Sequence, residues 1–311
     1  MITYFLRKKN AGSEGVLIRE KSIPDELAST RKNQQRYPRL FKLACDVKAS
    51  CLKGGPKSNE RFLPNDKLEQ LVTRECVLLC FQETTIEQEN YEDLATWVLE
   101  SGKRLFLILV LLTRDSEEQL SRLGELKNDG INDDVLPLGF SEIEPYYGYS
   151  LAAETDRARK FHSFQDWDDN NLILFKIYQW LFLAPVFGAN SKFRHQLRSE
   201  QPLPLLNQVK QSASSNGLGE IFRAEIHPAH IDSECLSALE VNNSGVQGLP
   251  VCIKKVQPSD NLHLFFDIDT GNFKARHPVI SPCRIKPIAS HKKNGEDFVI
   301  FLWIDDRNLH I

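Results

Sequence analysis

The sequence GLPVCIKKVQ, residues 248–257, has the composition of a buried β-strand, because it is rich in apolar and β-branched side chains. It nevertheless carries Lys254 and Lys255 side by side. Strand side chains alternate between two faces, so one of these lysines lies on the buried face, whichever face that is. Because an unpaired ammonium is costly to bury, the stretch predicts an anion that meets a lysine. The alternative is an edge strand on which both lysines reach water through their long stems.

The segments around this strand predict an antiparallel sheet. From about residue 203, short alternating stretches bounded by Gly, Pro, Asn or Asp replace long helical ones. They cover residues 219–227, 249–256, 283–291 and 297–303. Between the second and third stretch, apolar residues from Leu262 to Phe273 recur near helical spacing, which predicts one crossover helix over residues 260–278.

The first two-thirds of the chain predict helices. Apolar residues follow helical spacing through residues 62–81, 90–112, 115–130 and 166–187. Residues 131–150 are rich in turn formers, and residues 208–217 indicate a turn or linker. We therefore predict an α+β protein with a basic N-terminal segment (1–61), a mainly helical domain (62–202) and a sheet domain with one crossover helix (203–311).

Length and composition are those of a globular protein. The 311 residues are enough for two domains, and 41% apolar and 26% charged residues are ordinary globular values. The longest apolar run, Leu105–Leu112, is too short to cross a bilayer, and the N-terminus does not resemble a secretory signal. Seven scattered cysteines without a CxxC pair predict reduced thiols in an intracellular protein, cytoplasmic or nuclear.

Charge is unevenly distributed along the chain. The net charge is −3, but residues 1–61 carry +8 and the remainder carries −11. A basic segment can bind nucleic acid, yet no aromatic stacking pattern accompanies it, so we expect a solvated surface and no nucleic-acid partner. Cys76 and Cys80 lie one helical turn apart, but no further ligand follows at zinc spacing, and no metal site is predicted.

The C-terminal third resembles the small lobe of a protein kinase, in which two strands, a helix and a strand lysine recur in this order. Residues 214–227 resemble the glycine-rich loop and the strand that follows it, VCIK (251–254) resembles the V-A-I-K strand, and residues 298–309 resemble the strand that leads into the hinge. The stretches 179–187, 203–209, 224–230 and 301–309 are more narrowly similar to fungal proteins in which a helical region precedes a kinase domain.

This resemblance implies a site for ATP and Mg. Gly217 and Gly219 fall in the loop that covers the phosphates, although Ser214 and Asn216 stand where the family has its first two glycines. Lys254 corresponds to the lysine that pairs with the α and β phosphates.

Other positions correspond to the adenine pocket. Ile221 and Cys252 would lie above the base, Phe301 takes the gatekeeper position, and Trp303 lies in the hinge. Asp269 falls where the family places the crossover-helix glutamate that pairs with the strand lysine, and its side chain is shorter by one methylene.

The resemblance also suggests that these residues alone are inactive. The chain stops after the small lobe, with no His-Arg-Asp or Asp-Phe-Gly motif to position an acceptor and hold magnesium, so we expect a truncated serine/threonine kinase domain or pseudokinase. The alternative is a non-catalytic regulatory or interaction module that binds an unknown protein partner through its helices. A metalloenzyme or hydrolase is not expected, because His162 and His195 are lone histidines without ligand spacing.

Overall fold

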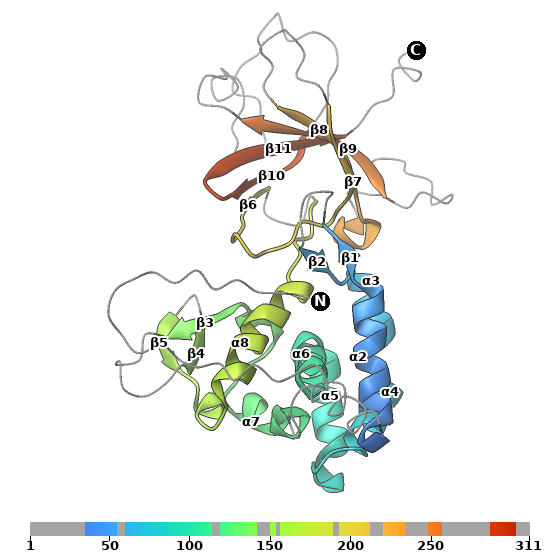
Figure 1. Cartoon of the computed structure of the whole chain (residues 1–311), viewed down its shortest axis with the longest axis vertical. Helices are drawn as coiled ribbons and strands as arrows, with labels where there is room; N and C mark the ends of the chain where they lie inside the picture. The colour runs from blue at the N-terminus through green and yellow to red at the C-terminus, as the bar shows by residue number, and fades with distance from the viewer. Residues whose placement is uncertain are drawn as a thin grey trace, which may run out of the picture.

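The computed structural model describes most of the chain and supports an α+β architecture. A mainly helical unit and a six-stranded sheet lie at opposite ends of the long axis of the molecule (Figure 1). The described residues are 35–54, 60–113, 119–141, 150–153, 156–188, 193–211, 220–233, 248–256 and 287–302.

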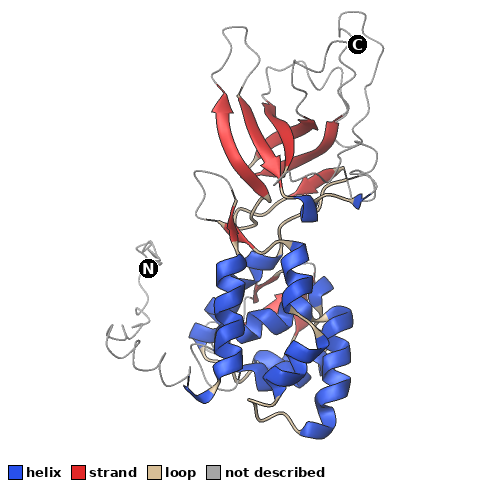
Figure 2. Ribbon diagram, turned by 90° about the vertical axis from the view of Figure 1, so that its right-hand side faces the viewer, coloured by secondary structure: helices blue, strands red, loops and turns tan. Residues whose placement is uncertain are grey.

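The helical unit is built from short helices around one apolar core (Figure 2). They are α2 (Pro38–Ser50), α3 (Asn65–Leu71), α4 (Arg74–Phe81), α5 (Tyr91–Ser101), α6 (Lys103–Thr113), α7 (Leu123–Asn128) and α8 (Asp169–Tyr178). Two predicted helices are each divided in two. The helical conformation is interrupted at Val72 and Thr73, between α3 and α4, and at Gly102, between α5 and α6. A Cβ at Gly102 would lie 2.8 Å from the Trp97 ring, so the break requires a glycine.

Helix α6 forms the centre of this unit. All eight residues from Leu105 to Leu112 are at most 1% exposed, because the helix is apolar on every side and its neighbours surround it. Its N-terminus is capped from another segment, since the Asp133 carboxylate accepts hydrogen bonds from the backbone N–H of Arg104 and Leu105 at 2.9 and 3.1 Å. Among the described residues, no helix is both long and apolar enough to cross a membrane.

The predicted division at residue 61 does not coincide with a boundary between cores. Helix α2 lies within the predicted N-terminal segment, yet Leu40, Leu43 and Val47 are buried in the same cluster as α6. The basic composition of residues 1–61 set this segment apart from the helical domain. The apolar residues of α2 recur at helical spacing within that basic segment.

A small antiparallel sheet lies beside α8, and its first strand falls within residues 131–150, where the sequence predicted turns. It consists of β3 (Leu138–Ser141), β4 (Ser150–Ala153) and β5 (Asp156–Lys160), in the order β3-β4-β5 (Figure 1). A second pair, β1 (Leu52–Lys53) and β2 (Arg61–Phe62), lies between the helices and the large sheet (Figure 1).

The large sheet has the order β6-β10-β11-β9-β8-β7. Its pairs are antiparallel except for β6 with β10, which are parallel. Strand β9 lies between β8 and β11, so the edge-strand alternative for residues 248–257 is wrong. The predicted linker at 208–217 is also partly wrong, since β7 enters it. The strands are β6 (Arg194–Gln196), β7 (Leu205–Gln211), β8 (Ile221–Ile226), β9 (Leu249–Val256), β10 (Pro287–Lys293) and β11 (Glu296–Leu302).

Side-chain alternation gives this sheet a second apolar core. Val251 and Ile253 of β9 are buried with Ala224, Ile226 and Ile300 on one face. The β10–β11 hairpin closes at Asn294 and Gly295, both with positive φ, as a tight hairpin turn requires. The predicted crossover helix at 260–278 lies outside the described residues.

A partly buried ion pair joins the two units. The ammonium of Lys293, at the end of β10, lies 2.8 and 2.7 Å from the two carboxylate oxygens of Glu60 and donates to the Gln201 carbonyl at 2.7 Å. Nearby, the buried Phe62 ring of β2 meets the His230 ring edge-on at a centroid distance of 5.3 Å. These contacts fix the sheet against the helical unit.

Candidate functional site

Two rows of residues cross the centre of the large sheet on the face opposite its apolar core. Lys254 of β9 pairs with Ile221 of β8 and with Val299 of β11. In the next row, Cys252 of β9 pairs with Phe301 of β11. Directly paired residues share a face, and so do residues two apart on one strand, so these five side chains lie on one surface. The structure therefore brings together the predicted residues Ile221, Cys252, Lys254 and Phe301.

The two adjacent lysines have different surroundings. Lys255 lies on the face of the apolar core, at its end, and its Nζ is 2.6 Å from Glu296 Oε1 and 3.9 Å from Glu220 Oε2. The hydrogen bond to Glu296 raises the pKa of Lys255. The anion predicted for the lysine on the buried face is therefore glutamate, and it meets Lys255.

Lys254 is half-buried on the opposite face. Its partner on β11, Val299, is fully buried, so this face is also shielded from solvent at its centre. Burial raises the pKa of the neighbouring Cys252 thiol, and the positive charge of Lys254 acts in the opposite direction. Cys252 is thus a neutral thiol that contributes an apolar surface beside the ammonium.

The connection between β7 and β8 leaves the sheet beside Lys254. It begins after Gln211, whose partner on β8 is Ile221, and Ile221 is in turn the partner of Lys254. The predicted loop residues Gly217 and Gly219 are part of this connection and lie outside the described residues.

Two more predicted site residues also fall outside the described part of the chain. They are the helix acid Asp269 and the hinge residue Trp303, which follows the last described residue of β11. Their relation to Lys254 stays a prediction.

Sequence reasoning missed two residues on this surface. Arg223 lies opposite Cys252 and two residues after Ile221, and its exposed guanidinium adds a second positive charge. Val299 adds apolar area beside Lys254. Period-two alternation from Ile221 and Phe301 could have found both residues, once the register between strands was known.

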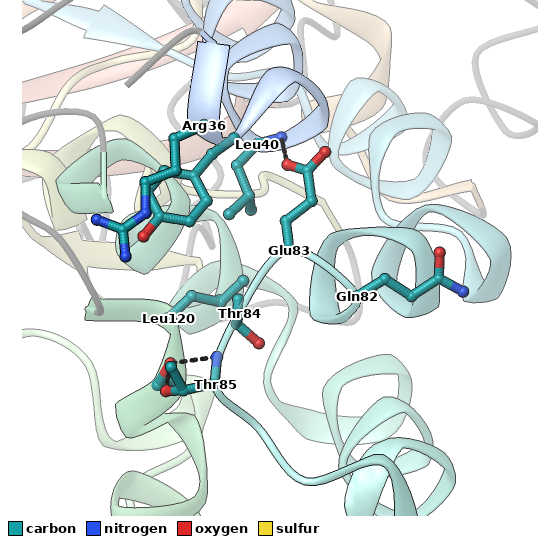
Figure 3. A pocket seen from close by; sticks show the side chains of 9 residues that line it. Arg36, Leu40, Gln82, Glu83, Thr84, Thr85 and Leu120 are labelled. Carbon is teal, nitrogen blue, oxygen red and sulfur yellow. Dashed lines mark hydrogen bonds between the residues drawn. The ribbon is translucent and has the colours of Figure 1, made fainter. Parts of the chain in front are cut away.

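A separate pocket of about 390 Å³ lies in the helical unit (Figure 3). Glu83 lies in its wall and caps α2, because its carboxylate accepts from the backbone N–H of Arg39 at 3.0 Å and of Leu40 at 3.1 Å. Another wall is closed by the Thr85 hydroxyl, which donates to Ser121 Oγ at 2.8 Å. The size of the pocket suits a small molecule. Its Glu83 and Thr85 side chains are already hydrogen-bonded within the protein, so they do not point to a catalytic role.

Metal binding has no support in the described ranges. They contain no group of three or more His, Cys, Asp or Glu side chains that could hold a metal ion.

No protein-family model matches the chain, and no curated protein or solved structure matches it.

Proposed function

We propose that Lys254 and the neighbouring side chains of Ile221, Cys252 and Phe301 bind ATP in the manner of a protein kinase small lobe. The observation that carries this proposal is the position of Lys254. Lys254 is half-buried on β9, the strand that pairs with β8 of the β7–β8 hairpin. Its direct partner is Ile221, the first residue of β8 after the hairpin connection. Kinases hold the α and β phosphates of ATP with a lysine on their third strand, beneath a glycine-rich connection between the first two strands.

The remaining side chains suit the base of a nucleotide. Ile221, Cys252 and Phe301 form an apolar surface next to the ammonium, and adenine is a flat ring that packs well on such a surface. Anion recognition and adenine packing would then be adjacent, separated by two residues along β9.

The proposal concerns binding and not phosphoryl transfer. Transfer requires groups that orient the acceptor hydroxyl and hold magnesium at the β and γ phosphates. The kinase motifs for these roles are not among the 311 residues, so the proposal for this segment is nucleotide binding alone.

Thermal unfolding with Mg-ATP tests this site. At about ten times its Kd, Mg-ATP should stabilise the protein by about 1.4 kcal/mol and raise Tm by about 3 °C. Lys254→Ala should abolish the shift. Lys255→Ala is the matched control, because its side chain binds Glu296 on the opposite face, and it should keep the shift.

Magnesium tripolyphosphate separates a nucleotide site from a simple basic patch. It lacks adenine and should give a clearly smaller shift than Mg-ATP at the same concentration. A wild-type protein that does not respond to millimolar Mg-ATP, or a Lys254→Ala variant that responds like the wild type, would overturn the proposal. The runner-up function, an interaction module on which the sheet serves as a scaffold, would then be preferred.

A further inference from the structure

Helix α4 presents two cysteines one turn apart, at the boundary between solvent and the helical core. Cys80 is buried, whereas Cys76 is half-buried near the start of the helix. Thr73 caps this start, since its hydroxyl accepts from the backbone N–H of Cys76 at 3.2 Å. Residues four apart on a helix lie one above the other on the same side, so both thiols point in similar directions.

The two thiols form a hydrogen bond and differ in acidity. This bond is the largest cause of the lowered pKa of Cys76 and of the raised pKa of Cys80. The Lys42 ammonium on α2 also favours the Cys76 thiolate, whereas burial and the carboxylates of Asp46 and Glu75 oppose it. Cys76 is therefore the more reactive sulfur of the pair, because the thiolate is the nucleophilic form.

The geometry of the pair excludes two common uses of cysteine. Structural zinc needs four ligands, and no group of three or more metal-ligating side chains occurs among the described residues. A disulfide needs Cβ atoms about 3.5–4.5 Å apart, whereas residues four apart on a helix hold them at about 5–6 Å. A bridge of one extra atom between the sulfurs would relieve this mismatch without unwinding α4.

We propose that Cys76 and Cys80 form a dithiol site for monosubstituted trivalent arsenicals. Arsenic in such a compound carries one carbon substituent and forms two further bonds, so two thiolates complete its coordination without a third protein ligand. The S–As–S angle is close to a right angle, which keeps the two sulfurs in contact, as the thiol–thiol hydrogen bond already does. Thiolates are the ligands that soft ions select. This site lies in the helical unit and is independent of the nucleotide proposal.

The reaction is a ligand exchange without oxidation. Cys76 attacks the arsenic of R–As(OH)₂, one As–S bond forms, one As–O bond breaks, and the departing hydroxide leaves as water with the thiol proton. Cys80 then replaces the second hydroxide in the same way and releases a second water. Arsenic stays trivalent throughout. The second step is intramolecular, so the cyclic product should resist exchange with a monothiol.

Phenylarsine oxide, which hydrates to the dihydroxy form, is the probe for this site. The 311-residue protein is incubated with one equivalent, challenged with excess glutathione and analysed by mass spectrometry. Trypsin should release residues 75–103 as one peptide, which contains both cysteines and no other. We expect this peptide to retain one phenylarsenic group and to lose it to 2,3-dimercaptopropanol.

Cys76→Ser and Cys80→Ser should each lower the glutathione-resistant adduct at least tenfold. Cys45→Ser is the matched control, because it removes an exposed single thiol on α2 and should leave the adduct unchanged. Cys76 is half-buried, so its variant tests the site even if Cys80→Ser fails to fold. A wild-type adduct that glutathione removes, or one that persists in Cys76→Ser at the wild-type level, would overturn the proposal.

Discussion

At the scale of single residues, polar side chains distant in sequence determine where several elements begin. Glu83 caps α2 and Asp133 caps α6, and both act across more than twenty-five residues of chain. A local cap occurs at α8, where the Asp168 carboxylate accepts from the backbone N–H of Asn171 at 2.9 Å. Local caps can be predicted because they follow a short motif, whereas caps from distant segments require knowledge of the fold.

Gln179 provides a residue-scale prediction. Its buried amide accepts from the Leu138 backbone N–H at 2.7 Å and donates to the Leu138 carbonyl at 2.8 Å, so it binds the start of β3. Gln179→Leu removes the side-chain amide and leaves the buried backbone N–H and carbonyl of Leu138 without this partner. We expect the free energy of unfolding to fall by about 1–3 kcal/mol. Gln165→Leu, at an exposed position, should change it by less than about 0.5 kcal/mol. Urea denaturation of both variants measures the difference, and equal values would refute this role.

At the scale of elements, the sequence was most informative where the periodicity was long or the strands were apolar. The helical pattern located α4 to α8, and the alternating stretches located β8, β9, β10 and β11. The pattern could not reveal β6 or β3, because three or four residues contain too few alternations to identify a strand.

The sequence did not predict strand β7, for a different reason. It is an edge strand with an irregular register between Leu206 and Val209, Asn207 has a positive φ, and Val209 is 62% exposed. Such a strand lacks the apolar alternation of a half-buried one. Four of the eight predicted site residues, Ile221, Cys252, Lys254 and Phe301, nevertheless share one face of the sheet. Arg223 and Val299 required the strand register, which depends on the whole sheet.

At the scale of the whole molecule, buried histidines should couple stability to pH. Burial lowers the pKa of His291 to about 3 and of His230 to about 4. The charges of His195 and Lys293 lower the pKa of His291 further. A hydrogen bond with the Pro185 carbonyl acts in the opposite direction on the pKa of His230. The unfolded chain binds protons at these histidines below about pH 6.5, while the folded protein does not, so stability falls as pH drops.

The expected loss is about 2 kcal/mol for each buried histidine between pH 7 and pH 5. His291→Phe, in which a ring can still stack on Phe298, should reduce the pH dependence of the free energy of unfolding by this amount. Urea denaturation at both pH values provides the measurement, with the exposed His162→Gln as the control. An unchanged slope in His291→Phe would show that this histidine is not the titrating group.

The central claim, that Lys254 faces a nucleotide, is tested most directly by an adenosine that carries a sulfonyl fluoride in place of its phosphates. A lysine amine attacks the sulfur, fluoride leaves, and a stable sulfonamide marks the residue that lies where the phosphates would bind. Peptide mapping should find the label on Lys254 in the wild-type protein, and excess Mg-ATP should prevent it. Labelling of Lys255, or of scattered surface lysines without protection by Mg-ATP, would contradict the account.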